Sequence, residues 1–349
     1  MQVTRRSFMV SAAAAACAPT FLGATDKSGS RTPILGQGEY RYEAIHDWGE
    51  LPGNIKYGNT HGVCEDSQGN IYIHHTVYAT SESQDTMVVF DAEGKFVRSW
   101  GRQFKGGAHG LTIRKEGSEE FLYLCDYEHG IVTKRTLKGE EVFTLGYPAE
   151  SDAYKPKDRT SAVVYRPTNV AIAPNGDIYV GDGYGSSFIN QYNQKAEFIR
   201  SFGGLGKGDD QLDCPHGLWV DTRVEPALLV VADRGNSRLH RFTFEGKHVD
   251  FVLGTSKMPC NLNERNGNVV IPDLLSKVIV LDHKNTVIAS LGEGEYTNKD
   301  WATVRNQASG TFLPGRFVCP HGACFDHEGN IFVVEWVETG RVTKLRHVA

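Results

Sequence analysis

The sequence predicts an all-β fold, a six-bladed β-propeller that occupies residues 40–349. Three observations lead to this fold class. A unit of two short apolar strands around a glycine-containing turn recurs six times. A second pair of strands lies between most copies, which gives four strands per copy. The last copy lacks its fourth strand, and the chain carries a matching strand near its beginning. Six four-stranded units in one chain are typical of a closed propeller.

The first two strands of each unit carry the clearest signal. The six copies begin at Asn59, Ala108, Pro167, Pro215, Pro259 and Pro320. Most copies turn at a short polar segment with glycine, as in residues 68–70, 175–177 and 328–330. Such turns need a positive φ angle, which glycine and asparagine adopt at low cost. The second strand usually ends at an acidic residue.

The outer strands and the closure of the ring follow from the same pattern. Residues 87–101 and 188–203 are strand pairs that fit the outer half of a blade. After two strands, the last copy contributes only residues 341–348. Residues 40–49, which end in Trp-Gly, have the form of the outer strand at residues 94–101. We therefore expect the N-terminal strand to complete the last blade and leave no open sheet edge.

Composition excludes some classes of function. The chain has 349 residues, a formal net charge of -5 and 40% hydrophobic residues. The mean hydropathy is -0.36 and the calculated isoelectric point about 6.2. These values fit a protein with a substantial core and no membrane span in the mature chain. A nucleic-acid partner is not expected, because phosphate binding needs a basic face.

The first residues have the features of an export signal. Arg5 and Arg6 precede an apolar, alanine-rich run of about 15 residues, which is the length of a signal h-region rather than of a membrane span. The sequence around the two arginines is typical of a twin-arginine (Tat) signal. We expect residues 1–24 to be the signal peptide, residues 25–39 a linker, and the mature protein periplasmic or extracellular. Lipid attachment at Cys17 is the less favoured alternative.

Six of the seven cysteines follow this signal, and they are scattered. They are Cys64, Cys125, Cys214, Cys260, Cys319 and Cys324. No CxxC pair occurs, so a compact zinc knuckle is not indicated. Since twin-arginine export carries folded proteins, disulfides are not needed for folding here, and small buried cysteines are expected.

The start of each innermost strand supplies the candidate metal site. The matched positions of the six copies are His61, His109, Asn169, His216, Cys260 and His321. His109, His216 and His321 come from blades two, four and six, so they converge on the axis with approximate three-fold symmetry. Zinc commonly takes three imidazoles and leaves a fourth position open. We predict a zinc site at these three residues, with His61 and Cys260 as additional axial donors and another divalent metal as the alternative. A purely structural role for a repeated Pro-His-Gly is the competing interpretation.

The motifs also resemble known families. The fourth copy, over Cys214–Leu239, is similar to the NHL repeat, and this resemblance covers about residues 40–349. Blades two to four and six resemble the catalytic core of peptidyl-α-hydroxyglycine α-amidating lyase, a zinc-dependent six-bladed propeller. The matching motifs are Ala108–Leu111, Pro167–Ala171, Val180–Tyr184, Pro215-His216, Ala232–Arg234 and Pro320-His321.

This resemblance implies cleavage of the N–C bond of a C-terminal α-hydroxyglycine, which releases a peptide amide and glyoxylate. The zinc ligands would be His109, His216 and His321. Tyr184 would act as the catalytic base, and Arg234 would bind a carboxylate through its planar fork. A structural tyrosine at a blade turn and an ion pair between Arg234 and Asp233 are the bland alternatives.

The chain departs from the lyase pattern at several positions. The family's first-blade arginine falls near residues 74–76, where this chain has no arginine. Gly322 stands where the family has a calcium ligand, so calcium is less expected than zinc. The connections Tyr147–Tyr165 and Gly292–Val318 are long, and the second contains Trp301, Arg305 and Arg316. Long loops near a propeller mouth are usual places for specificity.

Two other functions remain open from the sequence. A non-catalytic NHL propeller would bind a protein, peptide or glycan on one face. A lactonase or esterase of the propeller type would hold calcium through Glu, Asp and Asn, and Asn169 is the one axial residue that favours it. A small molecule or a peptide C-terminus is the substrate expected for the lyase-like enzyme.

Overall fold

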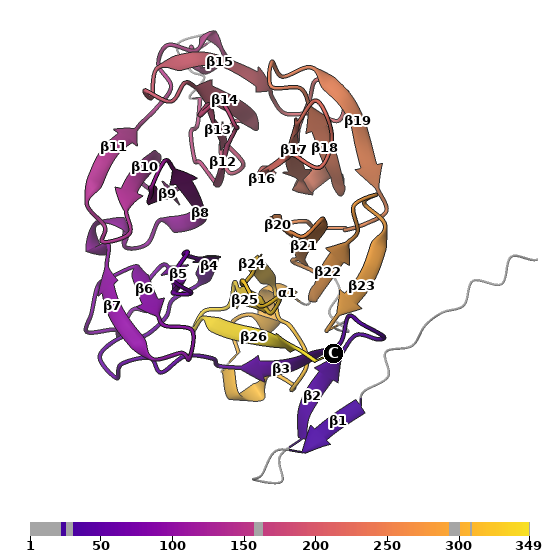
Figure 1. Cartoon of the computed structure of the whole chain (residues 1–349). Coiled ribbons are helices and arrows are strands. Elements are labelled where there is room, and N and C mark those ends of the chain that lie inside the picture. Colours follow the sequence, from indigo (N-terminus) through magenta and orange to yellow (C-terminus); the bar gives the residue numbers. More distant parts are fainter. Residues whose placement is uncertain (1–21, 26–30, 157–162, 293–300, 308, 349) are drawn as a thin grey trace, which may run out of the picture.

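The computed structural model has the predicted architecture, six four-stranded antiparallel sheets around a central axis (Figure 1). It describes residues 22–25, 31–156, 163–292, 301–307 and 309–348. Blade one consists of β4 (Thr60–Glu65), β5 (Ile71–His75), β6 (Met87–Phe90) and β7 (Phe96–Trp100), and blade two of β8 (Ala108–Glu116), β9 (Glu119–Asp126), β10 (Ile131–Thr136) and β11 (Glu141–Leu145). Blade three consists of β12 (Asn169–Ile172), β13 (Ile178–Gly181), β14 (Phe188–Tyr192) and β15 (Phe198–Gly203), and blade four of β16 (Pro215–Asp221), β17 (Leu228–Asp233), β18 (Arg238–Phe242) and β19 (His248–Leu253). Blade five consists of β20 (Asn263–Arg265), β21 (Asn268–Asp273), β22 (Lys277–Leu281) and β23 (Val287–Leu291), and blade six of β24 (Pro320–Phe325), β25 (Ile331–Glu335) and β26 (Arg341–His347) with β3 (Tyr42–His46).

The ring closes as the sequence predicts. Strand β3 pairs antiparallel with β26, with His46 opposite Thr343 and Tyr42 opposite His347. Trp48 follows β3, and its ring lies 4.7 Å from Phe332 of the last blade and 5.5 Å from Phe90 of the first. These edge-on aromatic contacts stabilise the junction beyond the apolar area that they bury. The first and last blades are therefore held together by both a strand and a shared core.

Two further strands extend the closing sheet. Strands β1 (Leu22–Thr25) and β2 (Arg31–Leu35) form a hairpin, and β2 pairs with β3 through Ile34 and Leu35. The region expected as a linker therefore contains a strand at the outer edge of the last blade (Figure 1). Residues 1–21, which include Cys17 and most of the expected signal peptide, lie outside the described residues.

The core lies between neighbouring blades. One cluster joins Ile71, Val88 and Phe90 of blade one to Phe332 and Val334 of blade six, all with almost no exposure. Other clusters join the remaining blades in the same way. Burying one such side chain stabilises the fold by about 1.5–3 kcal/mol, so the stacked blades supply most of the stability.

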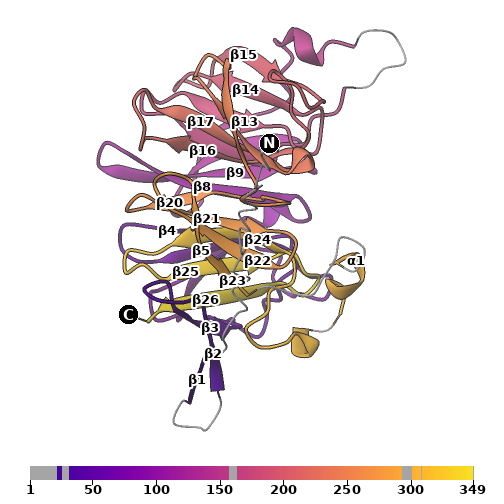
Figure 2. The same cartoon turned by 90° about the vertical axis from the view of Figure 1, so that its right-hand side faces the viewer.

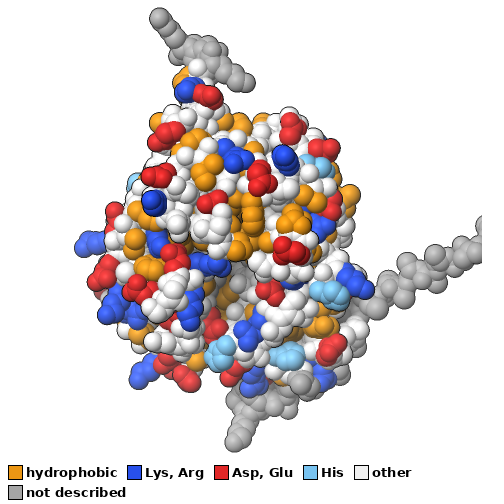
Figure 3. Space-filling model, turned by 45° about the horizontal axis from the view of Figure 1, so that its top comes forward, with side chains coloured by type: hydrophobic (Ala, Val, Ile, Leu, Met, Phe, Trp, Pro, Cys, Tyr) orange, Lys and Arg blue, Asp and Glu red, His pale blue; other side chains and the backbone are white. Residues whose placement is uncertain are grey.

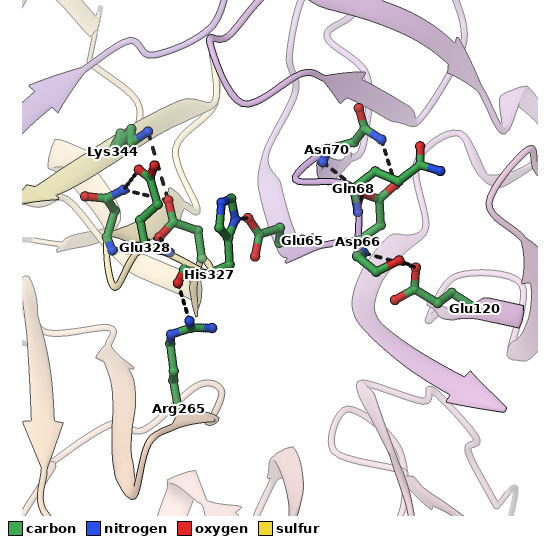
Figure 4. A network of polar contacts seen from close by, with 12 residues as sticks. Glu65, Asp66, Gln68, Asn70, Glu120, Arg265, His327, Glu328 and Lys344 are labelled. Atoms are coloured by element: carbon green, nitrogen blue, oxygen red, sulfur yellow. Dashed lines mark hydrogen bonds and ion pairs between the residues drawn. The ribbon is translucent and has the colours of Figure 1, made fainter. Parts of the chain in front are cut away.

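The two ends of the inner strands meet different surroundings. At the strand ends far from the histidines, turns of neighbouring blades bind one another (Figure 4). His327 of blade six pairs with Glu65 of blade one at 2.6 Å, and Ser67 donates to Glu120 of blade two at 2.6 Å. Arg265 of blade five donates to the carbonyl of His327. These contacts join the turns of neighbouring blades on this face of the propeller. The segments that connect one blade to the next lie at the opposite face.

Short helices lie in those connecting segments. They are η1 (Arg102–Phe104), η2 (Asp152–Tyr154), η3 (Arg234–Asn236), α1 (Trp301–Val304) and η4 (Ser309–Thr311). The turn α1, in the connection between blades five and six, projects from one side of the disc (Figure 2). Within the described residues, no helix has the length and apolar character of a membrane span. On the face in Figure 3, acidic and basic side chains are interspersed.

Candidate metal centre

Six side chains at or shortly before the starts of the inner strands line one cavity on the axis. They are the six predicted positions, His61, His109, Asn169, His216, Cys260 and His321. All six are buried, with at most 4% exposure. Among the residues that the structure describes, no carboxylate lines this cavity. The structure therefore brings the sequence-predicted residues together in a compact ring of nitrogen donors and one sulfur.

Three of the four histidines share one hydrogen-bond pattern. Each donates its Nδ1 proton to a backbone carbonyl of a neighbouring blade. His109 donates to Thr168 at 2.7 Å, His216 to Cys260 at 2.7 Å, and His321 to His61 at 3.1 Å. Because a carbonyl only accepts, these bonds fix the tautomer and leave the Nε2 lone pair free. Ligating histidines in proteins are commonly oriented in this way.

The glycine after each of these histidines explains the Pro-His-Gly motif. A Cβ atom added at Gly217 would lie 2.6 Å from the carbonyl oxygen that His216 binds. At Gly110 the corresponding distance to the Thr168 oxygen is 2.3 Å. Only glycine lets adjacent blades approach closely enough for the imidazole to reach that carbonyl. The motif is thus structural and, by the same contact, aims Nε2 at the axis.

His61 differs from the other three histidines. Its Nδ1 lies 3.4 Å from Nε2 of His321 rather than on a carbonyl of the next blade. This contact favours a role for His61 as a hydrogen-bond donor to the ring. The structure therefore singles out the predicted alternate-blade set, His109, His216 and His321, by their shared orientation. Their ring centroids lie 4.6–4.9 Å apart.

Acidic residues at the ends of the second strands hold these histidines in place from behind. Asp233 accepts from the backbone nitrogen of Asp213, three residues before His216, at 2.7 Å. Glu335 accepts from Val318, three residues before His321, at 2.5 Å. The recurrent acid of the repeat is therefore a clamp on the preceding loop.

The ring histidines are held neutral. Burial is the main cause, and it lowers the pKa of His109 and His216 well below the usual value. Burial also lowers the pKa of His321 to about 3, with Arg234 adding to the shift. Neutral imidazole is the form that binds a metal ion.

Tyr184 closes the ring on the side of blades two to four. Its hydroxyl lies 3.2 Å from Nε2 of His109 and 3.0 Å from Nε2 of His216. Burial raises the pKa of Tyr184 to about 12, while the nearby Arg234 opposes this shift. Tyr184 thus lies within hydrogen-bond reach of two proposed ligands, and burial favours its protonated form.

A count of hydrogen-bond donors provides a test of fit for a cation. The Nε2 atoms of His109, His216 and His321 are three lone pairs that point into one small space. The Tyr184 hydroxyl has one proton to give, and His61 has one. One of the three Nε2 atoms therefore has no donor within hydrogen-bond distance among the described residues. In a buried site this is costly unless a cation binds there or the Asn169 amide or Cys260 thiol of the same cavity turns toward it. The residues fit a metal ion.

Two groups of donors have ligand atoms close enough to hold one ion, and neither is the complete predicted set of His109, His216 and His321. His61, His109 and His321 form one, and His216, Cys260 and His321 form the other. Within each group the ligand atoms all lie within 4.8 Å of one another. His321 belongs to both. Neither group, among the described residues, contains Cys214 or Cys319, the two cysteines that precede Pro-His.

Two arginines flank the ring without a carboxylate partner in the part of the chain described. Asp233 binds Arg238 at 2.6 Å, which leaves Arg234 free of the expected ion pair. Arg234 instead stacks on Tyr184, with its Cζ 5.3 Å from the ring centroid. Arg305, from the long connection before blade six, stacks on Trp336 at 3.7 Å. Its positive charge contributes to the lowered pKa of His61 and His321.

The positions of the departures from the lyase pattern are also clear. His74 and His75 are fully buried in β5, so the place of the family's first-blade arginine is part of the blade interior. Asn169, which favoured the calcium-dependent hydrolase, uses its amide oxygen to accept from the backbone of Leu218 at 3.3 Å. The six cysteines of residues 64–324 are all free thiols. Sequence reasoning did not identify Tyr127, whose ring lies 5.8 Å from His109 and 5.6 Å from Tyr184.

The fold and the ring together define a class, a six-bladed β-propeller with an acid-free histidine site on its axis. No family model matches the chain. The chain is similar to peptidyl-alpha-hydroxyglycine alpha-amidating lyase 1 of Drosophila melanogaster, with 28% identity over 236 residues, 58% of this chain and 41% of the relative. It is also similar to the rat peptidylglycine alpha-amidating monooxygenase, with 27% identity over 275 residues, 68% of this chain and 26% of the relative. The chain thus spans less than half the length of these relatives.

Solved structures show the same fold at low sequence identity. A streptogramin B lyase superposes with a TM-score of 0.55 at 13% identity, over 88% of this chain and 99% of that one. A gluconolactonase of Xanthomonas campestris gives a TM-score of 0.54 at 11% identity, over 94% of both chains. These likenesses establish the propeller fold, which serves several kinds of chemistry.

Proposed function

We propose that this protein is an exported, metal-dependent propeller enzyme that cleaves a C–N bond in the manner of peptidyl-α-hydroxyglycine α-amidating lyase. The observation that carries the proposal is the set of three neutral imidazoles whose Nε2 atoms outnumber the donors within hydrogen-bond distance of them. The similarity to amidating lyases supports the reaction type. In the described part of the chain, the ring has none of the carboxylates that a calcium-dependent propeller hydrolase would need.

In this reaction the substrate hydroxyl loses its proton and its oxygen forms the carbonyl of glyoxylate. The C–N bond breaks, and the departing nitrogen takes up a proton to give the amide. A bound zinc ion would supply Lewis-acid chemistry that lowers the pKa of the substrate hydroxyl. His109, His216 and His321 would hold that ion.

Tyr184 is placed to handle the proton. Its hydroxyl touches two ring nitrogens, so it lies at the edge of the proposed metal site. To act as a base, Tyr184 must first lose its proton. Burial raises the pKa of Tyr184 and so disfavours this loss, whereas the positive charge of Arg234 lowers the pKa and favours it. The same oxygen can return a proton to the departing nitrogen, as general acid–base catalysis requires.

Arg234 and Arg305 fit the carboxylate of such a substrate. Neither pairs with an acid in the part of the chain described, and both are stacked on aromatic rings that fix their planes. A guanidinium binds a carboxylate through two parallel hydrogen bonds. Arg305 would take the place of the first-blade arginine that this chain lacks.

Metal content tests the proposal directly. The protein, purified from its export host without chelator, should contain about one zinc per chain, and His109→Ala and His216→Ala should lose it. His74→Leu, which changes a buried histidine outside the ring, should keep it. Retention of the metal in both ring variants, or its absence from all samples, would leave a non-catalytic binding propeller as the better account.

Activity then tests the reaction. An α-hydroxyglycine peptide should release glyoxylate and the corresponding amide with the zinc-loaded protein. The Arg234→Ala variant should retain zinc and show a raised KM, because Arg234 would contact the substrate and is not one of the three histidine ligands. Metal-loaded protein that releases no glyoxylate would refute the lyase assignment while leaving the metal site intact.

A further inference from the structure

Blade five breaks the repeat at the axis. Where blades one, two, four and six have His-Gly, blade five has Cys260 followed by Asn261. The inner strand β20 starts only at Asn263, so Cys260 lies in the segment before it, bound through its nitrogen to the carbonyl of Pro272 at 3.0 Å. This anchoring keeps the thiol at the depth that histidines occupy in the other blades.

The Cys260 sulfur lies within ligand reach of two ring histidines. Its Sγ and one nitrogen each of His216 and His321 are all within 4.8 Å of one another. The side chain is 1% exposed. The Cys260 carbonyl also accepts the Nδ1 proton of His216. The same residue therefore orients a neighbouring imidazole and presents a sulfur beside it.

Burial raises the pKa of the Cys260 thiol to about 12, and the nearby Arg234 opposes this shift. Nη1 of Arg234 lies 3.8 Å from Sγ and can donate to it. The thiol's own acceptor, the carbonyl of Met258, lies at 3.6 Å, near the limit for a sulfur hydrogen bond. Because the sulfur lies beside a guanidinium and makes only one long hydrogen bond to a backbone carbonyl, its side chain can rotate toward a metal ion. Thiolates are preferred ligands of zinc and other soft ions.

We propose that Cys260 is a thiolate ligand of the axial metal, which makes the centre a mixed nitrogen and sulfur site. This inference rests on the metal site of the proposed function and adds a donor to it. When the sulfur–metal bond forms, the Sγ proton is released to solvent, so the ligand is the thiolate. The centre would then select ions that accept sulfur, such as Zn²⁺ and Co²⁺, over calcium and magnesium.

Cobalt substitution tests the sulfur bond without any assay of activity. The full mature chain is stripped of metal under reducing conditions and titrated with Co²⁺, and the near-ultraviolet absorption is recorded. We expect a sulfur-to-cobalt charge-transfer band that saturates at about one equivalent. Cys260→Ser should lose the band and still bind cobalt through the three histidines, with lower affinity.

Cys214→Ser is the matched control, because Cys214 also lies near Arg234 but belongs to neither donor group. It should keep the band. Stoichiometric cobalt binding without the band in the unmodified chain would overturn the sulfur ligand and leave the histidine site standing. Failure of cobalt to bind at all would overturn the metal site of the proposed function as well.

Discussion

His74 offers a prediction in which stability can be calculated from the structure. Its imidazole is fully buried in β5, and neither ring nitrogen has a hydrogen-bond partner. Burial lowers the pKa of His74 to about 4, although the nearby backbone of His109 and Gly110 acts to raise it. The unfolded chain keeps a pKa near the usual 6.5. Below pH 6.5 the unfolded state therefore binds a proton that the folded state does not.

The sign of the effect follows from this difference. Since the unfolded state binds more protons, the free energy of unfolding falls as the pH drops from about 6.5 toward 4. At pH 5 the loss from His74 alone is about 2 kcal/mol relative to pH 7. His74→Leu removes this term. The variant should have a free energy of unfolding at pH 7 within about 1 kcal/mol of the parent, because two unpaired polar atoms are replaced by an apolar side chain.

Urea unfolding of the metal-free chain at pH 7 and pH 5 measures this. The drop in free energy between the two pH values should be about 2 kcal/mol smaller in His74→Leu than in the parent. His283→Gln, at an exposed turn position, should follow the parent. An unchanged drop in the His74 variant, or a loss of several kcal/mol at pH 7, would refute the view of His74 as a neutral packing residue.

Three further predictions concern the ring and its supports. Arg238→Ala should lower the free energy of unfolding by about 3–5 kcal/mol, measured by denaturant titration, because it leaves the buried Asp233 unpaired. Tyr184→Phe should lower kcat about 10²–10⁴-fold in the glyoxylate assay with little change in KM. A change in KM as large as the change in kcat would contradict a role in proton transfer. Gly217→Ala should destabilise the fold by about 1–3 kcal/mol and weaken metal binding together, since its Cβ would lie 2.6 Å from a carbonyl oxygen of blade five. Gly53→Ala, with open space around it, should do neither.

Much of the fold was predictable because each repeat has the same local sequence features. Glycine turns, short apolar strands and closing acids recur at each blade, and each blade can pack only against its neighbours. The closing strand was predictable because residues 40–49 match an outer strand of another blade. The hairpin of β1 and β2 was not, since these segments have no counterpart in the repeat.

The candidate site was predictable as a set of positions but not as a set of contacts. Equivalent places in the repeat identified the six axial residues. The distinction between His61 and His321 depends on the side-chain torsions, which one sequence does not reveal. The release of Arg234 from Asp233 depends on Arg238, four residues further along, which competes for the same carboxylate. The stacking of Arg305 on Trp336 joins two segments 31 residues apart in the chain.

The contacts that build the propeller also build its chemistry. A blade needs glycine beside the axis so that the next blade can approach, and that approach brings a backbone carbonyl to the Nδ1 atom of the preceding histidine. Each such bond leaves one more lone pair on the axis, where burial keeps the imidazole neutral and where the repeat's acids are occupied with loop nitrogens. In a propeller assembled in this way, several unprotonated Nε2 atoms face one axial cavity that, in the described residues, has no carboxylate. A cation that binds nitrogen ligands would satisfy these lone pairs, and Cys260 of blade five would add a sulfur ligand to them.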